Sequence, residues 1–514
     1  METKGGITLS RRNLWAFSIG GIGRDMTYYL YNNFLFLFIT FTKILTVQQF
    51  ALMNVIMVVY RIWDAVNDPI MGGIVEATKS RFGKFKPWIL IGAFVTAISI
   101  IGLFCLPATG WNYVVLFAVF YFLLDIGYTM NDIGYWAMLP ALAREEKDRN
   151  RLTSFSALWA GFGMLLATML VPLLTAGDFT IGGSANRAYF WVAIGTAFFL
   201  IAFQSMTCFC VKEKRFVSEA ESRERQGFKA LLRVIKNNDQ LLWTVAFSMI
   251  HLTGLAIVGA ANTLYIYITF GYQGILGAIV GALGGMSGFF VMLFYPRIAE
   301  KFRRKQLVSY AVIAVVIGNV LLLLSYLAIP AYGVEWDALY TAKLIGVTVA
   351  AFFTGISSQF IWLVIVISFS NCVEYNDLKT GQRNEAAIFS LRPFVVKMSS
   401  ALGQLGTFVI YITTGLKTVS DGIASAENAA NKGLLTALEK DTAIRGILSG
   451  VEHWRGIMLI SIICLIPVVC DLAALYVYRR KCALTEERYA DINAQIAERD
   501  AALISAGEMK VIEE

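Results

Sequence analysis

Apolar residues are concentrated in twelve long segments separated by short polar stretches. A helix needs ~20 mostly apolar residues to cross the ~30 Å hydrocarbon layer of a bilayer, and only helices or closed barrels satisfy their backbone polar groups there. The expected spans are 14–41, 48–76, 87–107, 112–142, 152–176, 188–211, 241–270, 274–296, 306–329, 339–372, 386–416 and 455–478. The pattern therefore predicts an all-α polytopic membrane protein with twelve transmembrane helices.

Lys and Arg alternate from one connecting loop to the next. The loops after the second, fourth, sixth, eighth and tenth spans are basic, whereas those after the third, seventh and ninth contain no Lys or Arg. Because basic loops are retained in the cytoplasm, we expect both termini on the cytoplasmic side. The start METKGGITLSRRN lacks the pattern of a cleavable signal peptide, so the first span is expected to act as the signal.

The long charged segment 212–240 divides the chain into six spans on each side. We expect an N-terminal half in 1–211, a C-terminal half in 241–478 and a cytoplasmic tail in 479–514. Two such halves, each built from inverted repeats of three helices, surround a central cavity in many carriers. A surface helix is expected in 212–240, one amphipathic helix in residues 431–454 of the outer segment 417–454, and a charged helix in the tail, and no function is assigned to them.

Composition narrows the class of protein further. The 514 residues are 57% hydrophobic and only 16% charged, and the mean hydropathy is +0.62. A soluble enzyme, a nucleic-acid-binding protein and a disordered chain are therefore excluded, and the net charge of +8 reflects the basic loops. The seven cysteines mostly lie in apolar runs without a metal-binding spacing, and His251 and His453 are the two histidines. His251 is interpreted as a hydrogen-bonding residue between helices.

Charged residues inside apolar spans carry most of the functional information, since each one needs a partner or a water-filled cavity. They are Arg24 and Asp25 in the first span, Arg61, Asp64 and Asp68 in the second, Asp125 and Asp132 in the fourth, Glu374 and Asp377 at the end of the tenth, and Arg392 and Lys397 in the eleventh. Structural ion pairs between helices are the alternative interpretation of this set.

The spacing in the second span predicts a cation site. Asp64 and Asp68 are four residues apart and share one helix face, with Asn67 beside them. Arg61, one turn earlier, is positioned to neutralise one of these carboxylates. Paired carboxylates with amide and hydroxyl oxygens suit a hard cation such as Na⁺, and a proton can use the same acids.

The fourth span presents a second polar face. Asp125, Thr129 and Asp132 follow one another at helical spacing and therefore lie on one side of the helix. Thr129 adds a hydroxyl oxygen to the acids of the second span if the two helices are neighbours.

The stretch YRIWDAVNDPIMGGIVEATKSRFGKFKPWILIG, residues 60–92, closely resembles the signature of the glycoside–pentoside–hexuronide:cation symporters. That family belongs to the major facilitator superfamily, and the melibiose permease is its type. The resemblance continues in 125–142 and 22–31 and, more loosely, in WLVIVISFSNCVEYNDLKTGQRNEA and FVVKMSSA of the second half. It implies the major facilitator fold, a bacterial inner-membrane location and sugar import driven by a cation.

The resemblance also implies roles for individual residues. The implied cation-binding residues are Asp64, Asn67, Asp68 and Thr129, with Na⁺ at Asp64 and Asp68. The implied sugar-binding residues are Arg24, Asp25, Asp132, Trp136, Trp362 and Lys397, and Arg61 and Asp125 are assigned to coupling or ion pairing. Lys397 either faces the sugar cavity or pairs with Asp64 or Asp68, and these alternatives remain open.

Two departures from the melibiose pattern leave the sugar undetermined. Ala157 replaces an arginine of the fifth helix, and Asp125 replaces a glycine. Glycosides, pentosides and hexuronides are therefore all candidates, and Na⁺ is favoured over H⁺ because several oxygen ligands are present. No cofactor and no nucleic acid is expected, the carrier is expected to be a monomer, and a lysolipid carrier or a passive facilitator is the alternative. An enzyme would need a nucleophile–base pair or metal ligands, and neither pattern is present.

Overall fold

The computed structural model describes residues 9–78, 80–143, 146–212, 236–299, 301–328, 338–381 and 385–505. Within these ranges the chain is helical. The helices are α1 (Arg11–Tyr29), the π-helix η1 (Leu30–Phe34), α2 (Leu35–Thr42), α3 (Val47–Ala77), α4 (Lys86–Cys105), α5 (Gly110–Leu142), α6 (Glu146–Thr175), the 3₁₀ turn η2 (Ile181–Gly183), α7 (Ala185–Cys210), α9 (Asp239–Phe270), α10 (Gly274–Ala299), α11 (Arg304–Ala328), α12 (Ala338–Thr380), α13 (Glu385–Thr413), α14 (Leu416–Asn431), α15 (Ala437–Ser449), α16 (His453–Lys481) and α17 (Glu486–Ser505).

All twelve expected spans coincide with helices in the described part of the chain, the first one with α1, η1 and α2 together. Ten of the described helices are apolar and long enough to cross a membrane on composition alone. The other two spans are the segment from α1 to α2 and the helix α3. They contain charged residues of the candidate site, which lower their hydropathy.

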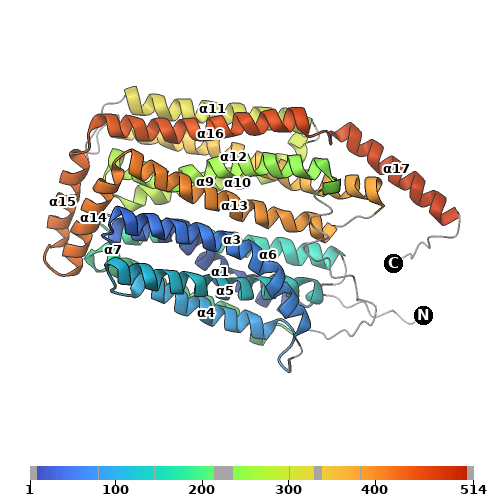
Figure 1. Ribbon diagram of the computed structural model, residues 1–514, viewed down its shortest axis with the longest axis horizontal. Coiled ribbons are helices and arrows are strands. Elements are labelled where there is room, and N and C mark those ends of the chain that lie inside the picture. Colours follow the sequence, from blue (N-terminus) through green and yellow to red (C-terminus); the bar gives the residue numbers. More distant parts are fainter. Residues whose placement is uncertain are drawn as a thin grey trace.

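Most of the helices run side by side along the long axis of the molecule in two groups, one from α1 to α7 and one that contains α9–α13 and α16 (Figure 1). The groups meet where α3 packs against α13 and α6 packs against α10. The expected boundary segment 212–240, with its surface helix, lies largely outside the described residues. The division at that segment therefore remains a prediction.

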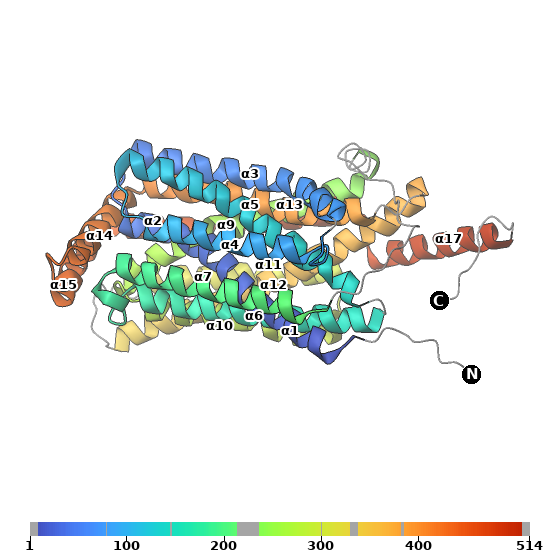
Figure 2. The same ribbon diagram turned by 90° about the horizontal axis from the view of Figure 1, so that it is seen from below.

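The amphipathic helix expected in 431–454 is present as α15, which begins at the capping box of Thr436 and Glu439 after the turn at Gly433. No helix was expected in the first part of the segment 417–454, where the structure has α14. In two perpendicular views, α14 and α15 lie at one end of the molecule, called here the hairpin end (Figures 1 and 2). The tail helix α17 lies at the opposite end, called here the tail end.

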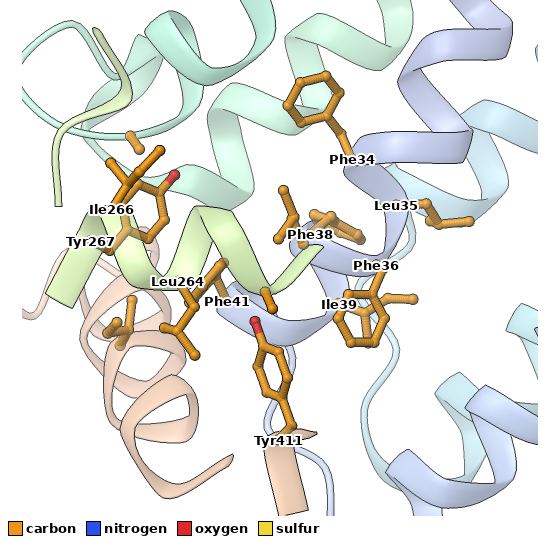
Figure 3. Close-up of a cluster of buried hydrophobic side chains, with 14 of the residues drawn as sticks. Phe34, Leu35, Phe36, Phe38, Ile39, Phe41, Leu264, Ile266, Tyr267 and Tyr411 are labelled. Carbon is orange, nitrogen blue, oxygen red and sulfur yellow. The ribbon is translucent and has the colours of Figure 1, made fainter. Parts of the chain in front are cut away.

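Buried apolar side chains are distributed unequally between the two ends. The largest cluster contains residues of η1, α2 and every described α-helix from α3 to α16, and so joins both halves near the hairpin end, with Phe36, Phe38 and Tyr411 among its members (Figure 3). A second cluster, which includes Phe247 and Phe369, lies within the C-terminal half, and a third, which includes Phe17 and Tyr135, lies within the N-terminal half. The two halves therefore share one core at the hairpin end and have separate cores toward the tail end.

Large apolar side chains also cover the outside of the bundle. Val115, Leu158, Phe198 and Leu465 are each more than 60% exposed. Water would penalise such a surface, whereas hydrocarbon chains do not, because they are as apolar as the side chains themselves.

Candidate functional site

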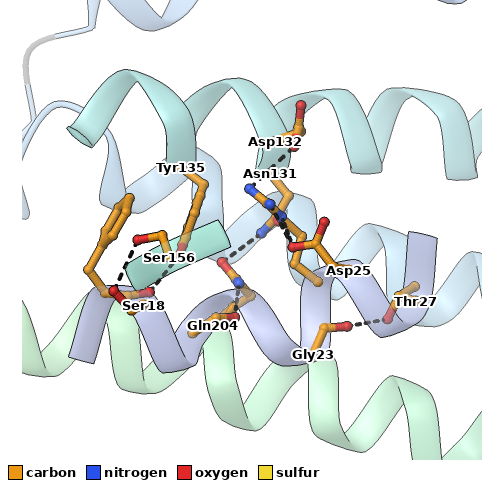
Figure 4. Close-up of polar contacts among 12 residues, drawn as sticks. Ser18, Gly23, Asp25, Thr27, Asn131, Asp132, Tyr135, Ser156 and Gln204 are labelled. Carbon is orange, nitrogen blue, oxygen red and sulfur yellow. Dashed lines mark hydrogen bonds and ion pairs between the residues drawn. The ribbon is translucent and has the colours of Figure 1, made fainter. Parts of the chain in front are cut away.

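The N-terminal part of the site depends on the tight packing of α1. A Cβ atom on Gly23 would lie 2.5 Å from the carbonyl oxygen of Phe199, so only glycine allows α1 to approach α7 this closely. Gln204 of α7 donates to the carbonyl of Gly20 at 2.7 Å, and Tyr135 of α5 donates to the carbonyl of Phe17 at 2.6 Å (Figure 4). These contacts fix the position of the next residues of α1, which carry charge.

Arg24 lies at the centre of the first polar cluster and is only 1% exposed. Its guanidinium contacts Asp25 at 2.6 Å and Asp132 of α5 at 3.4 Å. The same group lies 4.3 Å from the ring centre of Tyr135 and 4.7 Å from that of Trp136. Four residues predicted to bind sugar, Arg24, Asp25, Asp132 and Trp136, are thus brought together.

The second polar cluster joins the two halves of the molecule. Lys397 of α13 forms an ion pair with Asp68 of α3, and its ammonium nitrogen lies 3.0 Å from an oxygen of Asp64. Thr129 of α5 donates a hydrogen bond of 3.1 Å to that same Asp64 oxygen. Asn67 is also buried on α3 between the two acids. Of the two alternatives for Lys397, the structure has it paired with both acids.

Arg61 takes a different partner from the one its spacing suggested. It donates to the side-chain oxygen of Asn32 and lies 5.9 Å from the ring centre of Tyr31, and it forms no ion pair with a carboxylate in the described part of the chain. Asn32 belongs to η1, and its amide donates to the carbonyl of Tyr28 at 2.9 Å. The wider π-helical turn therefore directs Asn32 toward α3, an arrangement that is frequent at functional sites.

A group of tyrosines lies between the polar clusters. The ring centre of Tyr128 of α5 lies 5.3 Å from that of Tyr28 and 5.5 Å from that of Tyr31. Asp125, one turn earlier on α5, has a buried oxygen without a hydrogen-bond partner among the described residues. This unsatisfied oxygen is a position at which a proton or a bound cation would be favourable.

The C-terminal half contributes a stacked pair. The guanidinium of Arg392 on α13 lies 5.0 Å from the ring centre of Trp362 on α12. Arg392 stands five residues before Lys397 on the same helix. No described ion pair or hydrogen bond connects Trp362 to the cluster around Arg24, so its assignment to the sugar site remains a prediction.

Charge in this region is unbalanced. Five carboxylates, Asp25, Asp64, Asp68, Asp125 and Asp132, lie near three cationic side chains, Arg24, Arg61 and Lys397. Uncompensated carboxylates are costly at membrane depth. The region can therefore accept protons or small cations.

Sequence reasoning missed two polar residues. Asn32, the partner of Arg61, is uncharged, so a search for charged residues inside the spans did not select it. Asp471 is a carboxylate in the last span, and it pairs with His251 at 2.7 Å. The rule that selected the other charged residues inside spans would have found Asp471 as well.

The chain is similar in sequence to known sugar transporters. A sequence model of a family described as "MFS/sugar transport protein" matches residues 16–448. The lactose permease of Lactobacillus delbrueckii subsp. bulgaricus is 28% identical over 94% of this chain and 72% of its own length. The lactose permease of Leuconostoc lactis is 29% identical over 80% of this chain and 65% of its own length. The chain thus spans about two thirds of these relatives.

Solved structures show the same fold. A structure entitled "Crystal structure of D-xylose-proton symporter" aligns with 92% of this chain and 98% of its own, with a TM-score of 0.57 and 15% identity. At this identity the likeness concerns the fold, which is the twelve-helix fold of the major facilitator superfamily. The matched proteins are transporters and not enzymes.

Proposed function

Because the chain belongs to the MFS/sugar transport protein family, we propose that it is a symporter that imports a neutral glycoside together with a monovalent cation. The observation that carries this proposal is the contact of Lys397 with Asp64 and Asp68. A cationic side chain from one half of the molecule occupies a pair of acids on the other half. A transported cation that displaces it changes the contact between the halves.

The proposed cation site consists of Asp64, Asn67, Asp68 and Thr129. Thr129 already contacts Asp64, so carboxylate and hydroxyl oxygens are within reach of one ion. Na⁺ requires several oxygen ligands at once, whereas H⁺ requires a single carboxylate, and the number of oxygens here favours Na⁺. Asp125, with its unpaired oxygen, is the acid best placed for a proton if H⁺ is the coupling ion instead.

The proposed sugar site lies at Asp132 and Trp136 of α5. Both are partly exposed while Arg24 beneath them is buried. A carboxylate that accepts hydrogen bonds from hydroxyl groups and an aromatic ring under the sugar face are suited to a carbohydrate. Trp362 and Lys397 are the proposed sugar contacts from the C-terminal half.

A neutral sugar fits the described contacts better than a hexuronide. Arg24 is shared by two carboxylates, Lys397 contacts Asp64 and Asp68, and Arg61 donates to Asn32. An acidic sugar would need one of these cations to leave its partner. Lactose, the sugar in the names of the two lactose permeases, is a neutral disaccharide and is the first sugar to test.

Alternating access by rocking of the two halves explains how the two sites act together. The cation takes the place of Lys397 at Asp64 and Asp68 with the same single positive charge, and the release of Lys397 breaks this contact between α3 and α13. The shared α5 carries Thr129 at one site and Asp132 at the other, which links the sites. A passive facilitator would have no use for these acids, and a lysolipid carrier would have no use for the polar cluster at Arg24.

We further propose that the carrier is a monomer in a bacterial inner membrane, with the tail end in the cytoplasm. Arg303 and Arg304, at the basic loop between α10 and α11, pair with Glu487 and Glu486 of α17, which puts this loop at the tail end and supports the orientation. In that orientation the halves are joined on the outer side, through the core at the hairpin end.

The test is [¹⁴C]lactose accumulation in right-side-out membrane vesicles, with and without a Na⁺ gradient. Asp64→Asn and Asp68→Asn should abolish accumulation while leaving lactose exchange measurable, because the sugar contacts lie elsewhere. Asp441→Asn, which changes the same residue type in the pair with Arg445 on α15, is the matched control. Wild-type accumulation in both Asn variants would contradict the cation site, and a wild type that moves no lactose would redirect the test to other neutral glycosides.

A further inference from the structure

His251 of α9 and Asp471 of α16 form a buried pair inside the C-terminal half. The Nδ1 atom of His251 lies 2.7 Å from a carboxylate oxygen of Asp471, and the two residues are 2% and 3% exposed. Both positions lie well inside helices that span the membrane. The pair is separate from the cluster at Lys397, which lies between the halves.

The pair faces a cavity of about 210 Å³ that is lined by residues of α9, α10, α11, α12 and α16. Four neutral polar residues share its lining with the pair: Asn262, Asn319, Thr354 and Ser358. Asn319 and Thr354 donate to carbonyls of their own helices, at 2.9 and 3.0 Å, so their side-chain oxygens can still accept hydrogen bonds. Most of the remaining lining is apolar, so water is expected in the part of the cavity where these polar side chains and the pair can bind it.

Electrostatics decides which form of the pair is favourable. A neutral histidine beside an ionised Asp471 would leave one uncompensated negative charge in the hydrocarbon layer, at a cost of several kcal/mol. An imidazolium beside the carboxylate is neutral overall and contains one more proton. Of the described residues that line the cavity, His251 and Asp471 are the ionisable ones, so no third side chain there supplies the missing charge.

We propose that His251 and Asp471 form a second proton-binding site, which holds one proton and exchanges it with water through the adjoining cavity. This site is distinct from the proposed cation site at Asp64 and Asp68. The proton converts a net negative pair into a neutral one and thereby stabilises the contact between α9 and α16.

Other ionisable groups lie on the neighbouring elements, but none of those described lines the cavity. They are Arg297 on α10, Arg304 and Lys305 on α11, Lys343, Glu374, Asp377 and Lys379 on α12, Arg392 and Lys397 on α13, Glu439, Lys440, Asp441 and Arg445 on α15, and Cys470 next to Asp471. Lys343 is the one on the same face of α12 as the lining residue Val347, and its ammonium lies 4.7 Å from the ring centre of Tyr326.

The composition of the chain makes a direct test practical, because it has two histidines. The full-length protein is labelled with ¹⁵N-histidine, reconstituted in lipid bilayers and examined by solid-state NMR from about pH 5 to about pH 9. A His453→Gln variant assigns the remaining signal to His251. We expect an imidazolium at neutral pH that releases its proton reversibly at higher pH.

Variants of Asp471 separate proton binding from simple packing. Asp471→Asn should leave His251 neutral at pH 7, whereas Asp471→Glu, which keeps the acid, should retain the imidazolium. A neutral His251 over the whole pH range, an imidazolium that never exchanges, or one that persists in Asp471→Asn would each overturn the proposal.

The wild-type titration decides the question even if Asp471→Asn fails to fold. Because no sugar and no sodium is added, the result is also independent of the proposed symport.

Discussion

Asp25 and Asp132 share the Arg24 guanidinium but differ in what they offer to a ligand. The side chain of Asp25 is 8% exposed, whereas that of Asp132 is 37% exposed. Asp25 also makes the shorter contact with Arg24. We infer that Asp25 holds Arg24 in place and that Asp132 is the acceptor within reach of a sugar hydroxyl.

Replacement of Asp132 by Asn should weaken lactose binding by about 1.5–3 kcal/mol, because a charged acceptor is lost from a partly desolvated site. Isothermal titration calorimetry on the purified protein measures the change. Trp136→Phe should retain part of the affinity and Trp136→Ala less, since the ring supplies the stacking surface. Unchanged affinity in Asp132→Asn would move the sugar site away from α5.

Lys397 competes with the coupling ion in the proposed mechanism, which gives a second prediction at this scale. In Lys397→Met the acids Asp64 and Asp68 lose their partner, so the protein should unfold at a lower temperature without Na⁺ and gain more from added Na⁺ than the wild type. Thermal unfolding at increasing NaCl, with choline chloride as the salt control, measures both effects. Lys397→Arg, which keeps the charge, should behave as the wild type does, and an equal Na⁺ effect in all three proteins would show that Lys397 does not occupy the ion site.

At the scale of helices, the hairpin of α14 and α15 is attached to the N-terminal half by polar contacts. Glu427 accepts a hydrogen bond of 2.6 Å from the backbone N–H of Ala185, at the start of α7, and pairs with Lys440 at 3.3 Å. Asn428 donates to the carbonyl of Thr42 at 2.8 Å. Since the hairpin lies between α13 and α16 in the chain, these contacts tie the two halves together.

Burial raises the pKa of Glu427 above its ordinary value of 4.5, although Lys440 and the N–H of Ala185 act in the opposite direction. A raised pKa means that the folded protein binds this proton more tightly than the unfolded chain does. The resulting stabilisation is complete below about pH 4.5 and is lost as the pH rises through the folded-state pKa. Glu427→Gln should remove this component, so its unfolding temperature should vary less over that interval than that of the wild type, and parallel curves would contradict the assignment.

The sequence predicted helices better than it predicted contacts between them. Each of the twelve spans was found because lipid imposes a length and an apolar composition, which are local properties. The helix expected in 431–454 is confirmed by α15, whereas α14 was not predicted, because its 16 residues are too short and too polar to be recognised as a span. The spacing of Asp64 and Asp68 placed them on one face, but the choice of Lys397 as their partner depends on a contact between residues 333 positions apart.

At the scale of the whole molecule, the unequal distribution of buried apolar side chains determines at which end the two halves separate more easily. The halves share buried apolar side chains at the hairpin end and have separate cores toward the tail end. Separation at the hairpin end would expose the shared core and break the contacts of Glu427 and Asn428. The cation and the sugar must supply the differential binding energy for that step, and by linkage each must raise the affinity for the other.

The coupling ion sets the energy source of the complete cycle. If Na⁺ binds at Asp64, Asp68 and Thr129, lactose uptake at a fixed membrane potential should follow the Na⁺ gradient with the pH held constant. Thr129→Ala removes a hydroxyl that contacts Asp64 and should weaken Na⁺-driven uptake while leaving proton-driven uptake nearly intact, because a proton needs no second oxygen ligand. Thr153→Ala, whose hydroxyl donates to the carbonyl of Arg149 in its own helix, is the matched control. Uptake that follows the pH gradient alone, and is equal in Thr129→Ala and the wild type, would identify the proton as the coupling ion.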